Sequence, residues 1–72
     1  MSIGTSRDLA KSDTPNDSFS WVLVTDTAGS IVYGQRGGNT TTITVAPVGV
    51  WMPVGNATHV TTGSTAEGIV VA

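Results

Sequence analysis

Hydrophobic and polar residues follow the pattern of short β-strands from residue 18 onward, and turn residues separate one stretch from the next. No stretch carries an apolar stripe at helical spacing over three turns. We therefore predict an all-β module of six strands at residues 19–25, 30–36, 40–45, 50–54, 57–62 and 67–72. Turns spaced by roughly 8–12 residues are typical of a small antiparallel sandwich or barrel.

The first predicted strand is apolar on both faces. Phe19, Trp21 and Leu23 are expected to share one face, and Val22 and Val24 the other, because side chains alternate along a strand. A strand of this kind is either central in a sandwich or covered by a neighbouring subunit.

Glycines mark the expected turns and close approaches of the chain. Gly29 is free to take a positive φ, so residues 26–29 are expected to turn the chain back as a hairpin. Gly34 suggests a bulge or a close backbone approach within its strand. Gly55-Asn56 is read as a turn between two strands, and Gly68 as a tight entry into a last strand paired inside the sheet.

The first seventeen residues differ in composition from the rest. They hold five of the eight charged residues and few large apolar side chains, so they have no core face of their own. Residues 1–17 are either a frayed terminus or an extended arm that orders on another chain, and residues 18–72 form the β module. For the arm, the residues assigned to anchoring on a partner surface are Ile3, Arg7, Leu9 and Lys11.

The chain has 72 residues, enough for one domain near the lower limit of independent stability. Small domains usually add disulfides, a metal ion or oligomerisation. With no cysteine and one histidine, disulfides, thiolate metal sites and multi-histidine metal sites are excluded, so we expect an oligomer that needs no cofactor.

The charge pattern also narrows the partners. Three basic residues and a net charge of −2 do not provide the cluster that neutralises phosphates, so nucleic acid is not an expected partner. No run approaches the length of a membrane span. The first eight residues lack the apolar segment of a secretion signal, so we expect synthesis in the cytoplasm.

Few titratable groups follow residue 18, and they are Asp26, Arg36, His59 and Glu67. Catalysis usually needs several such groups brought together, and no nucleophile motif such as Gly-x-Ser-x-Gly is present. We expect that the protein is not an enzyme. His59 is expected on a strand at the surface or at an interface, where it could titrate near neutral pH.

The aromatic residues admit three interpretations. They could form the core, they could lie between subunits, or the tryptophans could stack on a carbohydrate with Asn39 and Asn56 as hydrogen-bonding neighbours. One thin core cannot easily enclose two tryptophans and a methionine. We therefore assign a subunit interface to Trp21, Val22, Tyr33, Trp51 and Met52.

Several segments resemble one family, the head spike base proteins, which are small virion proteins of tailed phages and gene transfer agents. The matching segments are Thr14–Ser18, Thr27–Gly29, Met52–Val54 and Val60–Val71, and the last of these is the most specific. In Gly55-Asn56 the chain departs from the family, whose members tend to carry a basic residue there.

The resemblance implies a structural subunit on the capsid surface of a phage or phage-like particle. Its expected partners are copies of itself, as a trimer or a pentamer, and the major capsid protein or a spike fibre. The alternatives are a module that binds host-surface polysaccharide and a structural component of the neck or tail.

Overall fold

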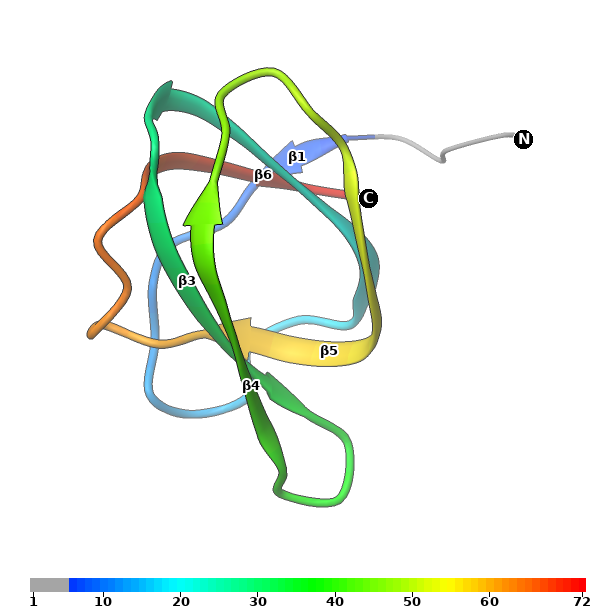
Figure 1. Cartoon of the computed structure of the whole chain (residues 1–72). Coiled ribbons are helices and arrows are strands. Elements are labelled where there is room, and N and C mark those ends of the chain that lie inside the picture. The colour runs from blue at the N-terminus through cyan, green and yellow to red at the C-terminus, as the bar shows by residue number, and fades with distance from the viewer. Residues whose placement is uncertain (1–5) are drawn as a thin grey trace.

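The computed structural model describes residues 6–72, and this part of the chain consists of strands and loops without a helix. The strands are β1 (Arg7–Asp8), β2 (Phe19–Thr27), β3 (Gly29–Gln35), β4 (Thr40–Ala46), β5 (Met52–Val60) and β6 (Glu67–Val71). They form one antiparallel sheet in the order β1-β6-β2-β5-β3-β4, which confirms the all-β class and the short antiparallel strands. The sheet is single and open, and it curls round the core instead of forming a two-layer sandwich (Figure 1).

The loop between β5 and β6 runs along β3 and forms hydrogen bonds with its backbone. The amide of Thr65 donates to the carbonyl of Ser30 at 3.0 Å, and the amide of Thr61 donates to the carbonyl of Val32 at 2.8 Å. The amide of Val32 in turn donates to the hydroxyl of the buried Ser64 at 2.8 Å. The loop therefore satisfies backbone groups of β3 that β5 does not reach.

The connection between β4 and β5 forms a backbone contact with β2. Val48 forms an isolated parallel bridge with Val24 of β2, and the amide of Gly49 donates to the carbonyl of Val24 at 2.8 Å. This contact joins the chain after β4 to the middle of the sheet. The contact ties the chain after the edge strand β4 back onto β2 without a seventh strand.

β5 corrects the prediction of two strands separated by a turn at Gly55-Asn56. The strand is continuous, and its first half pairs with β2 while its second half pairs with β3. Asn56 has a φ of 59°, a left-handed conformation that asparagine adopts more readily than most residues. The local turn signal is therefore used as a bend within one strand, where the strand changes its partner.

The predicted hairpin between the first two long strands is also wrong. β2 lies between β6 and β5, and β3 lies between β5 and β4, so the two are not neighbours in the sheet. Gly29 has no positive φ. Its role is a close approach, because a Cβ there would lie 2.6 Å from the Oγ1 of Thr65 and 2.8 Å from the amide nitrogen of Ala66.

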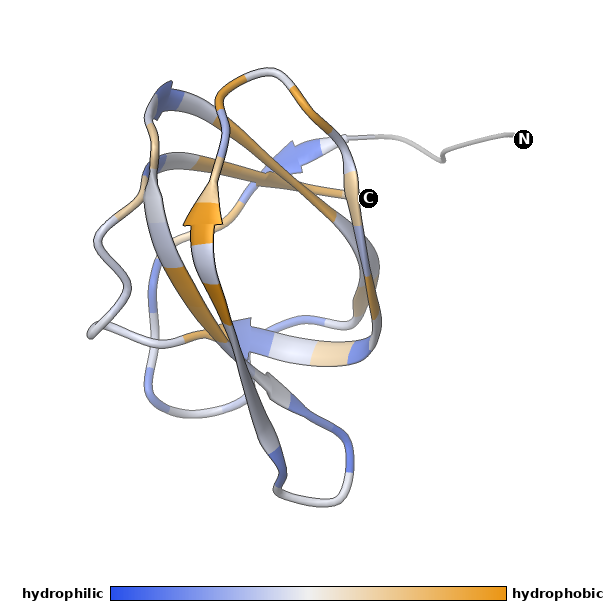
Figure 2. Ribbon diagram, viewed as in Figure 1, coloured by the Kyte–Doolittle hydropathy of each residue, from blue (hydrophilic) through white to orange (hydrophobic). Residues whose placement is uncertain are grey.

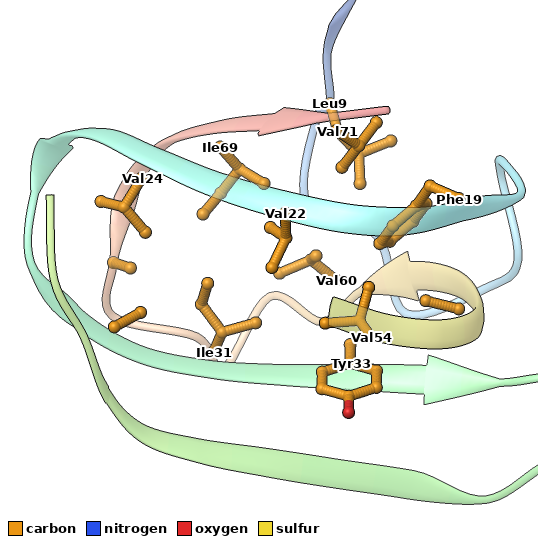
Figure 3. Close-up of a cluster of buried hydrophobic side chains, with 13 residues drawn as sticks. Leu9, Phe19, Val22, Val24, Ile31, Tyr33, Val54, Val60, Ile69 and Val71 are labelled. Atoms are coloured by element: carbon orange, nitrogen blue, oxygen red, sulfur yellow. The ribbon is translucent and has the colours of Figure 1, made fainter. Parts of the chain in front are cut away.

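The core lies on the inner face of the curled sheet (Figure 3). Its members are Leu9, Phe19, Val22, Val24, Ile31, Tyr33, Ala46, Val54, Ala57, Val60, Ala66, Ile69 and Val71. Figure 3 shows these side chains converging from β2, β3, β5 and β6, with the hydroxyl of Tyr33 directed away from the cluster. Hydrophobic residues mark these strands in Figure 2, whereas the hairpin between β3 and β4 is mostly hydrophilic.

A bulge in β2 overturns the prediction that Phe19 shares a face with Trp21. The register against β5 shifts between these two residues. Phe19 is therefore buried on the same side as Val22 and Val24, and Trp21 points to the outer side with Leu23. A strict alternation would have placed either Phe19 or the two valines outside the core.

Residues 6–17 correct the prediction of an arm ordered by another chain. Leu9 is 9% exposed within the module's own core, and its amide donates to the carbonyl of Ile69 at 3.0 Å. Farther along, the amide of Ser12 bonds to the carbonyl of Val60, and the amide of Asp17 bonds to that of Thr58. The described part of the arm is thus a component of the module, while Ile3 lies outside the described residues.

The prediction that the C-terminal strand pairs inside the sheet is confirmed. β6 pairs with β2 along one side and with the two residues of β1 along the other, and Ile69 and Val71 are buried. Gly68 has a φ of 74°, and a Cβ there would overlap the Oγ1 of Thr25. The glycine therefore permits the tight entry into the strand that the sequence predicted.

Candidate assembly surface

The candidate site is a surface, because the described residues enclose no pocket and bring together no three metal-ligating side chains. Every buried polar side-chain atom among residues 6–72 has a hydrogen-bond partner. His59 is half-buried on β5, its Nδ1 lies 2.9 Å from the hydroxyl of Thr58, and its ring covers Gly34. The bulge predicted as one of two alternatives at Gly34 is present, because the register of β3 against β5 shifts between Gly34 and Gln35. The close contact at Gly34 is with a side chain, since a Cβ there would overlap the imidazole.

An apolar strip follows the outer side of β2. Trp21 and Leu23 alternate with Val22 and Val24, which are fully buried on the inner side. Both outer residues are only half-buried. The strip is therefore on the face of β2 that the module's own core does not use.

Neighbouring strands widen this strip. Trp21 lies opposite Pro53 of β5, and Leu23 lies opposite Val70 of β6. Pro53 follows Met52, which packs against the core, so Pro53 is on the outer side. Trp51 directly precedes β5, is half-buried, and is not among the residues packed against the core. We call the set of Trp21, Leu23, Trp51, Pro53 and Val70 the tryptophan face.

The tryptophan face is suited to contact with another protein. Tryptophan is enriched at protein interfaces and among the residues that dominate binding energy. The cross-strand neighbours of Trp21 are Pro53 and Ala72, whose side chains offer no hydrogen bonds to a sugar. Asn39 and Asn56 lie elsewhere, in the hairpin after β3 and at the bend of β5. These surroundings favour a protein contact over a carbohydrate platform.

The structure divides the predicted interface residues into two groups. Trp21 and Trp51 are half-buried on the outer side, which is compatible with an interface. Val22 is fully buried and Tyr33 is 7% exposed, both in the chain's own core, so their assignment to an interface is corrected. Met52 is half-buried and packs against the core. The prediction missed Pro53, Leu23 and Val70, of which Leu23 could have been found from its two-residue spacing to Trp21.

The predicted anchoring cations are engaged within the chain. Arg7 donates through Nε and Nη2 to the two carboxylate oxygens of Asp17, at 2.9 and 2.7 Å, and its Nη2 also donates to the carbonyl of Ser18 at 2.9 Å. These hydrogen bonds raise the pKa of Arg7 and lower the pKa of the Asp17 carboxyl. Lys11 donates through Nζ to the carbonyl of Ser64 at 2.8 Å and to Glu67 at 3.3 Å. Lys11 therefore fastens residues 6–17 to the module, whereas Arg7 joins the two ends of the segment. Leu9 is buried in the chain's own core and is not available to another chain.

Comparison of this chain with protein-family profiles, with characterised proteins and with solved structures found no match. Within residues 6–72 no helix is long and apolar enough to cross a bilayer.

Proposed function

We propose that the chain is a structural subunit of a tailed-phage or phage-like particle, located on the capsid surface as a decoration, cement or spike-base protein. It assembles with copies of itself and binds the major capsid protein or a spike fibre. The sequence resemblance to head spike base proteins supports the class of particle. It acts by binding and carries out no reaction.

One observation carries the proposal: the tryptophan face lies outside a core that is already complete. The core cluster contains neither tryptophan. A protein of this size that places two tryptophans on its outer side has apolar surface which a partner can cover. Covering a large aromatic side chain removes apolar area from water, with a gain of roughly 25 cal/mol per Å² before the costs of association.

The experiment locates the chain on particles from the cells that encode it. Antibody against the chain, coupled to gold, is applied to purified tailed particles and viewed by electron microscopy. We expect label on the heads. Particles without label, with the chain recovered only from the particle-free fraction, would refute the proposal, and label confined to the neck or tail would favour a structural role there.

Variants then connect the location to the tryptophan face. Trp21→Thr removes the large aromatic side chain but keeps a residue that favours strands. Arg36→Thr is the matched control, because Arg36 carries a large exposed side chain outside both the tryptophan face and β4. We expect Trp21→Thr to abolish the label on heads and Arg36→Thr to retain it, with both proteins folded by circular dichroism.

A further inference from the structure

The two edges of the sheet differ in length and chemistry. β1 is two residues long and charged, and its Arg7 is engaged by Asp17. β4 at the other edge is seven residues long, Thr40–Ala46, and has neither a charge nor a proline. Natural proteins usually protect an edge strand with charges, prolines or short length, so β4 is the unprotected edge.

The register of β4 shows which of its backbone groups are free. Val32 lies opposite Thr42, and both backbone groups of Val32 point away from β4, toward the loop residues Thr61 and Ser64. In an antiparallel pair of strands, the backbone amides and carbonyls of two facing residues either bond to each other or all point away from the partner strand. The amide and carbonyl of Thr42 therefore point away from β3, to the open edge.

Thr40 repeats this arrangement two residues earlier. It lies opposite Gly34, whose carbonyl accepts a hydrogen bond from the hydroxyl of Thr58 on the β5 side. Among the described residues, no backbone hydrogen bond outside the β3–β4 pair involves any residue of 40–46. The open edge therefore presents a row of unpaired donors and acceptors around Thr42.

We propose that β4 pairs in an antiparallel manner with β4 of a second copy of this chain, across a two-fold axis near Thr42. Each Thr42 then donates its amide to the carbonyl of the partner copy's Thr42. On the same face, Thr40 lies opposite the second copy's Thr44, so threonine meets threonine throughout, a favourable cross-strand pair. The pairing deepens the self-assembly part of the proposed function and does not depend on binding to a capsid.

The charge and exposure of β4 favour a second copy of this chain as the partner of the open edge. Residues 37–66 contain no Asp, Glu, Lys or Arg, so two copies of β4 meet without opposing like charges. Thr40, Thr42 and Thr44 are all exposed. Among residues 6–72, the exposed large hydrophobic residues are Val45, which is within β4, and Val48 and Val50, which follow it. Because β1 is short and charged, the association closes at two copies and does not extend into a filament.

The test compares two lysine variants by analytical ultracentrifugation over about 1 µM to 1 mM, the range in which weak dimers dissociate. We expect the wild type to have a molecular mass in solution of twice the 7.3 kDa of one chain. Thr42→Lys places two like charges opposite each other at the axis, and we expect it to weaken dimerisation at least tenfold. Thr27→Lys is the matched control, an exposed threonine at the end of β2 with the same added charge, and we expect it to dimerise like the wild type.

Hydrogen exchange on the wild type tests the same contact without a substitution. We expect protection of the Thr42 amide that rises with protein concentration. A wild type that stays monomeric overturns the proposal, as does a dimer that Thr42→Lys leaves intact with a rapidly exchanging Thr42 amide. A trimer or pentamer that Thr42→Lys leaves intact also overturns the edge pairing, but it is compatible with the proposed virion function.

Discussion

Leu9 provides the sharpest test of whether residues 6–17 belong to the module. The side chain is 9% exposed and packs in the core, and its backbone amide bonds to Ile69. Leu9→Ala keeps the backbone bond and removes only the buried side chain. If the segment were an arm for another chain, the isolated protein would not be affected.

The expected loss of stability follows from this burial. Truncation of a buried leucine to alanine costs about 2–5 kcal/mol, and Leu9 at the margin of the core belongs near the lower end, about 2–3 kcal/mol. A 72-residue domain has a free energy of unfolding of about 4–11 kcal/mol. The variant therefore loses a large share of its stability, and its melting temperature falls by roughly 8–24 °C.

Urea unfolding followed by tryptophan fluorescence measures the loss. Asp8→Ala is the matched control, because Asp8 precedes Leu9 in the same segment and its exposed side chain makes no hydrogen bond in the structure. We expect the control to remain within about 0.5 kcal/mol of the wild type. A change of less than about 0.5 kcal/mol for Leu9→Ala would refute the conclusion that this segment is part of the core.

Three further predictions concern a close contact, a carboxylate and the last strand. Gly34→Ala should destabilise the fold by about 1–3 kcal/mol, since its Cβ overlaps the His59 ring, and His59→Ala in the same chain should restore most of the loss in a double-mutant cycle. The amide and hydroxyl of Thr62 lower the pKa of Asp13, so its contribution to stability is present at neutral pH and lost as the pH falls through its folded-state pKa. Unfolding measured between about pH 7 and pH 2 should therefore show a weaker acid dependence for Asp13→Asn, and an identical dependence would contradict this. Deletion of residues 68–72 should abolish the folded circular dichroism spectrum, because it removes two core side chains and a strand paired on both sides.

Local pattern predicted most of the strand segments. The stretches that became β2, β3, β4 and β6 have β-branched or aromatic residues bounded by glycine or polar turns, and these preferences act over a few neighbouring residues. For the same reason the bulge at Gly34 and the tight entry at Gly68 could be inferred from a glycine within a strand pattern. The candidate surface was found in part, since Trp21 and Trp51 were predicted at an interface and both lie on the outer side.

Strand pairing and the choice of buried side chains depend on contacts between segments far apart in the chain. Gly55-Asn56 is a turn by local preference, but pairing with β2 before it and β3 after it keeps β5 continuous. A bulge after Phe19 changes which residues of β2 face the core, and a bulge depends on the register with the neighbouring strand, not on the local sequence. Leu9, directly after β1, is buried in the core and donates its amide to Ile69 of β6, sixty residues away in the chain. Most strand segments could be predicted because strand preference depends on neighbouring residues. Pairing, register and burial depend on contacts between distant segments, which only the folded chain brings together.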